Sequence, residues 1–128
     1  MSKCRLCDQE ILSQVLKGKV IALDVGHGWN TTALFDVGAE GNGKTEQELN
    51  KVTANKAAEF LKTLGATVHV FEYSDPNLRL SLREKGKRAG VVKADVFVSI
   101  HHNAFNGQAQ GTETCIDSEA TAEDSVLA

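Results

Sequence analysis

The chain has 128 residues, of which 41% are hydrophobic and 24% are charged, a size and composition typical of one globular domain with a hydrophobic core. Its formal net charge of −3 argues against the basic surface that proteins use to bind nucleic acid. No apolar stretch approaches the roughly 20 residues that span a bilayer, and residues 1–19 lack the uninterrupted hydrophobic segment of a signal peptide.

The first 18 residues are predicted to be a linker or a partial segment that precedes one domain at 19–128. Their apolar residues at near-helical spacing are Ile11, Leu12, Val15 and Leu16. Cys4 and Cys7 form a C-x-x-C pair, which is half of a zinc ribbon, and Cys115 is the third cysteine. Because a second pair is absent, a linker is favoured over a metal site. The odd number of cysteines does not favour a disulfide framework.

The first predicted strand is residues 19–25, K-V-I-A-L-D-V, a nearly continuous apolar run. It ends at residues 26–28, G-H-G, where paired glycines allow a sharp turn beside the histidine. Residues 29–44 are expected to form a long loop without regular structure. The glycines that interrupt this loop are Gly38, Gly41 and Gly43. So long a loop in a compact domain is more often functional than not. Its aromatic residues Trp29 and Phe35 either stack on sugar or pack as a lid, and packing is favoured.

A helix is predicted to follow Thr45, because Thr45 and Glu48 have the spacing of a capping box and Gly65 is a natural helix end. The apolar stripe expected on this helix consists of Leu49, Val52, Ala57, Phe60, Leu61 and Leu64. Residues 66–72, A-T-V-H-V-F-E, are then predicted to form the second strand, in which His69 is interpreted as structural.

Residues 74–76, S-D-P, predict a turn that caps a second helix from about Asn77 to Lys93, and residues 95–100 are the third strand. Alternating strands and helices predict an α/β fold, with a mainly parallel twisted sheet and helices on both faces. Further candidate elements are a strand at 112–116 and a helix capped by Asp117 or Ser118.

Three side chains with metal-binding chemistry are expected at one edge of this sheet. His27 follows the first strand, His101 follows the third, and Glu46 lies in the first turn of the intervening helix. Two imidazoles and one carboxylate with an open fourth position are the ligands of a catalytic zinc site. Each residue also has an ordinary interpretation. Glu46 suits a helix N-terminus by itself, and His102 is either a further ligand or a solvent-facing neighbour.

Four segments of the sequence resemble the zinc-dependent N-acetylmuramoyl-L-alanine amidases that cleave bacterial peptidoglycan. They are V-I-A-L-D-V-G-H-G at 20–28, D-V-G-A-E-G-N-G-K-T-E-Q-E-L-N at 36–50, L-S-L-R-E at 80–84 and D-V-F-V-S-I-H-H-N-A at 95–104. The segments occur in the family's order, and the resemblance covers residues 19–128. It implies that zinc is bound by His27, Glu46 and His101.

The resemblance also implies a hydrolase that cleaves the amide between N-acetylmuramic acid and L-alanine and acts at the bacterial cell wall, outside the cell or in the periplasm, as an autolysin or endolysin does. The family's catalytic glutamate lies on a later strand, and none of Glu113, Glu119 and Glu123 occurs in that motif. The catalytic residue is therefore unassigned, and the domain is expected to be truncated at its C-terminus.

Two further roles and one alternative function complete the predictions. Asp24 is expected to orient a metal ligand, and Asn103 is expected to contact the substrate, peptidoglycan or a muropeptide. Because the late glutamate is missing, the alternative is a catalytically impaired fragment or a module that binds zinc or peptidoglycan without hydrolysing it.

Overall fold

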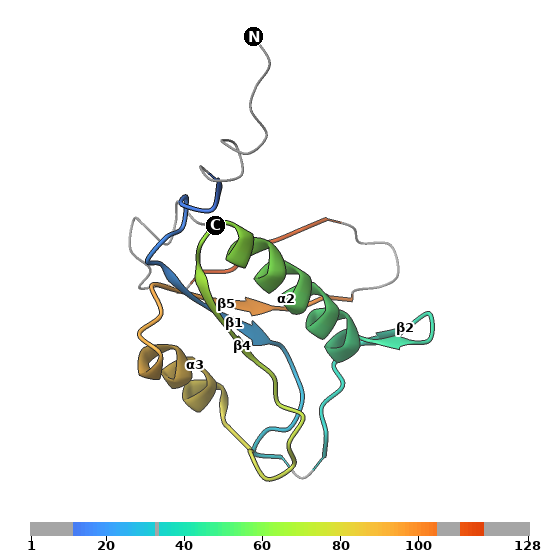
Figure 1. Cartoon of the computed structure of the whole chain (residues 1–128). Coiled ribbons are helices and arrows are strands. Elements are labelled where there is room, and N and C mark those ends of the chain that lie inside the picture. Colours follow the sequence, from blue (N-terminus) through green and yellow to red (C-terminus); the bar gives the residue numbers. More distant parts are fainter. Residues whose placement is uncertain (1–11, 33, 105–110, 117–128) are drawn as a thin grey trace.

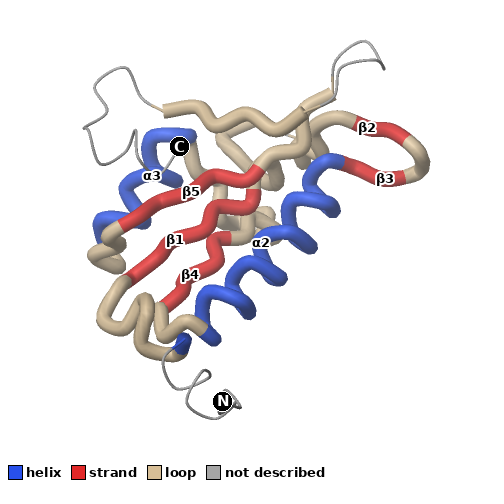
Figure 2. The backbone as a smooth tube through the Cα atoms, turned by 90° about the horizontal axis from the view of Figure 1, so that it is seen from above, coloured by secondary structure: helices blue, strands red, loops and turns tan. Residues whose placement is uncertain are grey.

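A computed structural model of the chain describes residues 12–32, 34–104 and 111–116. The strands of its main sheet are β1 (Val20–Val25), β4 (Thr67–Phe71) and β5 (Val96–Ile100). Their order is β4-β1-β5, and both outer strands run parallel to β1. Figure 2 shows β1 between its two neighbours. The apolar runs therefore predicted all three strands correctly, to within one residue at each end.

Two helices cover the opposite faces of this sheet (Figure 1), and they are α2 (Glu46–Thr63) and α3 (Leu82–Val91). Alternate residues of β1 account for the two layers, because successive side chains of a strand point to opposite faces. Ile21 and Leu23 pack with Ala58 of α2, whereas Ala22 packs in a second cluster with Ala89 of α3. The predicted α/β fold with helices on both faces is confirmed.

The start of α2 is fixed by the predicted capping box. The Thr45 hydroxyl accepts a hydrogen bond from the Glu48 backbone N–H at 3.2 Å, and the Glu48 carboxylate accepts one from the Thr45 N–H at 2.9 Å. At the other end, Gly65 has a φ of 93°, a left-handed conformation that glycine adopts without strain. The first residue of α2, Glu46, is thereby placed at the carboxyl edge of the sheet.

The apolar stripe predicted for α2 is wrong at three of its six positions. Leu49, Val52 and Phe60 are 40%, 53% and 63% exposed, although Ala57 and Leu61 do pack against the core. The residues that α2 buries are Glu46, Gln47, Asn50, Ala54 and Ala58. The fully buried apolar residues of α2 are therefore alanines, and the buried residues near its start are polar.

The second helix begins at Leu82, five residues later than predicted. Its N-cap is Ser81, which forms a capping box with Glu84. Asp75 is used in a turn instead, where its carboxylate accepts a hydrogen bond from the Asn77 backbone N–H at 2.8 Å. Two capping signals therefore occur in this stretch, at residues 74–76 and at Ser81, and the one at Ser81 starts the helix.

The long loop after β1 is also more ordered than predicted, because it contains a short hairpin made of β2 (Glu40–Gly41) and β3 (Lys44–Thr45). Asn42 and Gly43 have φ angles of 51° and 71°, the left-handed pair that closes a two-residue hairpin turn. The expected packing of Trp29 and Phe35 is confirmed, since their rings meet edge to face with centroids 5.5 Å apart.

Two terminal predictions have different outcomes. Residues 112–116 form no strand, whereas the helix predicted to begin after Asp117 or Ser118 lies outside the described residues. Cys4 and Cys7 also lie outside them. Within residues 13–18 the chain makes turns, and Leu16 packs partly against the core. No described helix is long and apolar enough to cross a membrane.

Candidate metal centre

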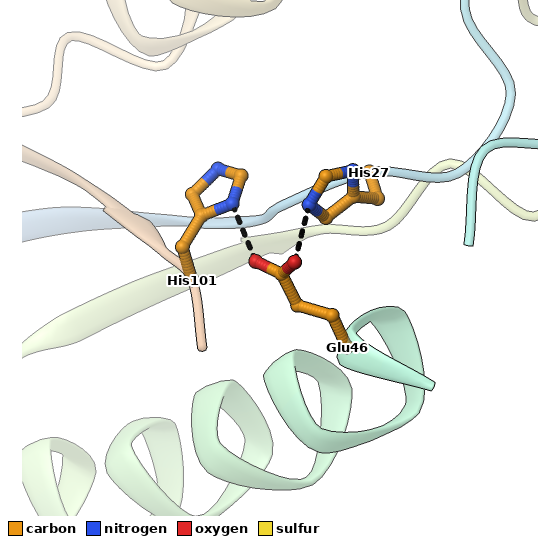
Figure 3. Close-up of side chains that lie close together, drawn as sticks. All are labelled: His27, Glu46 and His101. Carbon is orange, nitrogen blue, oxygen red and sulfur yellow. Dashed lines mark hydrogen bonds and ion pairs between the residues drawn. The ribbon is translucent and has the colours of Figure 1, made fainter. Parts of the chain in front are cut away.

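The three predicted ligands come together at the carboxyl edge of the sheet (Figure 3). His27 follows the end of β1 by two residues, His101 directly follows β5, and Glu46 is the first residue of α2. One ligand atom from each residue lies within 4.8 Å of the other two, so that this group could hold a metal ion. The parallel arrangement of β1 and β5 produces this proximity across 74 positions of sequence, since 101 − 27 = 74.

The Glu46 carboxylate joins the two imidazoles. Its Oε2 lies 3.0 Å from Nε2 of His27, and its Oε1 lies 2.9 Å from Nδ1 of His101. The same oxygens accept hydrogen bonds from the backbone N–H groups of Ala39 and His102, at 3.0 and 3.1 Å. Burial by itself raises the pKa of Glu46, but these hydrogen bonds together lower it to about 2. The buried carboxylate is therefore an anion at neutral pH.

Asp36 fixes the orientation of His27. Its Oδ2 lies 3.0 Å from Nδ1 of His27, which leaves Nε2 facing Glu46. Burial alone lowers the pKa of His27, but the hydrogen bonds with Asp36 and Glu46 raise it above 6.5. Backbone hydrogen bonds between Gly28 and Asp36, at 2.8 and 3.3 Å, hold the loop against the end of β1. A carboxylate on the far nitrogen of a metal-binding histidine is the usual supporting contact.

Two glycines leave the space in which the ligands sit. A Cβ on Gly26 would lie 2.5 Å from Cε1 of His101, and a Cβ on Gly38 would lie 2.6 Å from Nε2 of His27. Both distances are shorter than side chains tolerate without displacement. His27 itself has a φ of 71°, an unusual left-handed conformation for a residue with a side chain.

Residues 21–128 of the chain match the family described as N-acetylmuramoyl-L-alanine amidase. The chain belongs to this amidase family. It is 36% identical over 113 residues to the uncharacterized protein YqiI of Bacillus subtilis, a match that covers 88% of this chain and 52% of YqiI. It is 34% identical over 115 residues to the N-acetylmuramoyl-L-alanine amidase LytC of the same organism, covering 89% of this chain and 22% of LytC.

The fold is likewise that of solved amidases. The catalytic domain of CwlV, an N-acetylmuramoyl-L-alanine amidase from Bacillus (Paenibacillus) polymyxa var. colistinus, aligns with a TM-score of 0.58 and 34% identity. The alignment covers 72% of this chain and 49% of the CwlV chain. The chain therefore spans about half the length of YqiI and of the CwlV structure, and about a fifth of LytC.

A cleft of about 500 Å³ opens beside the predicted ligands, and His27, His101, Asp36 and Lys85 line it. Lys85 is only 5% exposed, and its Nζ donates a hydrogen bond to the His27 carbonyl oxygen at 3.0 Å. Burial lowers the pKa of this lysine. The sequence analysis did not identify Asp36 or Lys85. Asp36 reaches His27 through an irregular loop, and Lys85 reaches the His27 carbonyl oxygen from α3, a contact between distant segments that local patterns do not encode.

The two remaining predicted residues lie beside the ligand group without touching it. Asp24 is buried and accepts hydrogen bonds from the hydroxyls of Tyr73 and Ser99, and no described contact joins it to a ligand side chain. It lies on the α3 face of the sheet because it alternates with Leu23 along β1. Asp36 makes with His27 the kind of supporting contact that was predicted between Asp24 and an unspecified ligand. Asn103 is exposed and donates a hydrogen bond to Glu113. Its contact with substrate stays a prediction.

Proposed function

We propose that this chain is a zinc-dependent N-acetylmuramoyl-L-alanine amidase that hydrolyses the amide between N-acetylmuramic acid and L-alanine in peptidoglycan, at the bacterial cell wall. The convergence of His27, Glu46 and His101 within 4.8 Å, in a chain of the amidase family, supports this proposal most directly. Family membership favours a hydrolase over a module that binds zinc or peptidoglycan without catalysis. Within the chain, we assign the amidase domain to residues 19–128 and a linker or partial segment to residues 1–18.

The residues at the centre fit zinc in number, chemistry and charge. Zinc sites in hydrolases use two imidazoles and a carboxylate and leave one position open. His27 would bind through Nε2, because Asp36 occupies its Nδ1, and His101 would bind through Nδ1, the atom nearest Glu46. Glu46 is already ionised at neutral pH and contributes one negative charge. Zinc bound there supplies a Lewis acid that polarises the amide carbonyl and acidifies a water molecule.

The chain's own residues prepare the site for this chemistry. Asp36 holds His27 in one orientation, and Lys85 holds the His27 backbone through its carbonyl oxygen. The cleft beside the ligands provides a place for the scissile amide. The group that transfers a proton to the leaving amine is unassigned within the described residues.

Zinc content tests the ligand assignment, and muropeptide cleavage tests the reaction. After zinc loading and removal of excess metal, we expect about one zinc per chain by elemental analysis. His27→Ala and His101→Ala are expected to lose it, whereas His69→Ala should keep it. His69 lies in β4 outside the ligand group and is a matched histidine control.

The reaction is followed by mass spectrometry, in which cleavage releases a stem peptide with a free L-alanine amino group. A folded wild-type chain without zinc would refute the metal site. A zinc-loaded chain that leaves muropeptides intact would refute the proposed hydrolysis while leaving the metal site in place.

A further inference from the structure

Asn50 is a fully buried amide that lies one turn after Glu46 on α2 and is 0% exposed. A buried amide costs free energy unless its donor and acceptor are both used, and an apolar residue at this position would pack without that requirement. The polar side chain therefore calls for a specific reason. Its hydrogen bonds supply one.

The Asn50 side chain connects the segments that carry the two ligand histidines. Its Nδ2 donates to the Gly26 carbonyl oxygen at 3.2 Å, and Gly26 immediately precedes His27. Its Oδ1 lies 2.7 Å from Nδ1 of His102, which immediately follows His101. One side chain on α2 thus bonds to Gly26 and to His102, the residues adjacent to the two proposed ligands.

Hydrogen-bonding chemistry fixes the direction of every contact in this group. A carbonyl oxygen only accepts, so the Asn50 amino group must face Gly26 and its oxygen must face His102. The Nδ1 of His102 therefore carries a hydrogen and donates it. In the neutral imidazole Nε2 is then an acceptor, and it lies 3.4 Å from the Thr53 hydroxyl. The backbone N–H of His102 also donates to Glu46.

These directions separate His102 from the metal ligands. Its Nδ1 is committed to Asn50, and its Nε2 faces Thr53 on the next turn of α2. His102 is exposed, as one interpretation of the sequence expected, but its ring is hydrogen-bonded and not free. His102 therefore connects the end of β5 to α2 and is not a further ligand in this arrangement.

We propose that Asn50 and His102 act together as positioning residues, which clamp the ends of β1 and β5 to α2 and so preorganise His27 and His101 for metal. This inference rests on the proposed metal site and assigns neither residue a contact with the ion or the substrate. Without the clamp, the two imidazoles sample wider separations, and metal binding must restore the ligand geometry. Replacing outer residues of this kind typically weakens metal binding about 10–100-fold.

The test is the zinc dissociation constant, measured by competition with a chromophoric chelator for the wild-type chain, Asn50→Ala, His102→Ala and the double variant. We expect each single variant to bind zinc about 10–100-fold more weakly. The double variant should be no weaker than Asn50→Ala alone, because the two residues share one connection. Gln47→Ala is the matched control. Gln47 is a buried amide on the same helix, and no described side-chain hydrogen bond joins it to either strand end.

A spectroscopic measurement separates positioning from general stability. The visible spectrum of the Co²⁺-loaded chain reports ligand geometry, and we expect it to change in Asn50→Ala and His102→Ala but not in Gln47→Ala. Wild-type affinity and spectrum in folded Asn50→Ala would overturn the proposal. If Asn50→Ala does not fold, unchanged zinc binding by His102→Ala would overturn it instead. A wild-type chain that binds no zinc would refute the underlying metal site, which is a distinct result.

Discussion

The start of α2 and the rest of the helix bury different kinds of side chain. From Glu46 to Asn50 the buried residues are polar, and Glu46 and Asn50 bond to the segments that carry the proposed ligands His27 and His101. From Ala54 onward the buried residues are Ala54 and Ala58, and Ala58 packs with the core of the sheet. The helix therefore contributes polar groups to the candidate metal centre at its start and small apolar groups to the core farther along. Buried positions on this helix are therefore not identified by hydrophobicity alone, because Glu46, Gln47 and Asn50 are buried and Phe60 is exposed.

The largest effect is expected from removing the charge at the ligand end. Glu46→Gln keeps the shape of the side chain but lacks the anion that faces both imidazoles. We expect it to lose stoichiometric zinc, a greater loss than the about 10–100-fold expected of an outer residue. Elemental analysis after gel filtration measures this loss. Full zinc occupancy in Glu46→Gln would place the metal elsewhere. The start of α2 would then have no role in metal binding that the rest of the helix lacks.

The pH dependence of the metal-free chain tests the same carboxylate by a different route. The pKa of Glu46 is lowered to about 2 from 4.5, so its stabilising contribution is complete above pH 4.5 and is lost as the pH falls toward 2. The shift corresponds to at most about 3 kcal/mol in the free energy of unfolding. We expect urea unfolding of the wild-type chain to weaken more between pH 5 and pH 3 than that of Glu46→Gln. Equal weakening would mean that the carboxylate makes no net stabilising contacts.

Where Ala58 of α2 packs on the sheet, a larger side chain should lower the stability of the chain without changing its metal binding. Ala58→Leu inserts volume where α2 packs on Ile21 and Leu23, and overpacking of this kind costs about 1–3 kcal/mol. The position is 12 residues from Glu46, about 18 Å along the helix, so the zinc affinity of the folded chain should be unchanged. Asn55→Leu, at an exposed position on the same helix, is the control. Weaker zinc binding by a folded Ala58→Leu chain would show that packing at Ala58 affects the geometry of the metal centre at Glu46.

The sequence predicts the features that depend on strong local or topological signals. Apolar runs located the three strands, the capping box of Thr45 and Glu48 located the start of α2, and parallel alternation brought His27 and His101 to one edge. Other features depend on contacts between segments that local patterns do not encode. Asp36 reaches His27 only because the loop returns to Gly28.

The wrong boundary predicted for α3 and the wrong face predicted for α2 also have physical explanations. The start of α3 was misplaced because two capping signals lie within a few residues of each other, and only Ser81 is followed by a glutamate at the reciprocal position. The buried face of α2 was misassigned because its pattern contains both large apolar residues and alanines. A close approach between helix and sheet selects the small ones, Ala54 and Ala58, and leaves Phe60 outside.

The smallest effect on the free energy of unfolding is expected at Phe60. This residue distinguishes the predicted buried stripe of α2 from the observed exposed face. Its side chain is 63% exposed, whereas Phe71, on the α3 face of the sheet, is 6% exposed. Phe60→Ala should change the free energy of unfolding by no more than about 1 kcal/mol, because the little burial that is lost is offset by the higher helix propensity of alanine. Phe71→Ala makes the same chemical change in the core and should cost about 3–5 kcal/mol. Urea unfolding of both variants measures the difference. Equal costs would mean that the outer face of α2 is covered in solution and that the predicted stripe is buried after all.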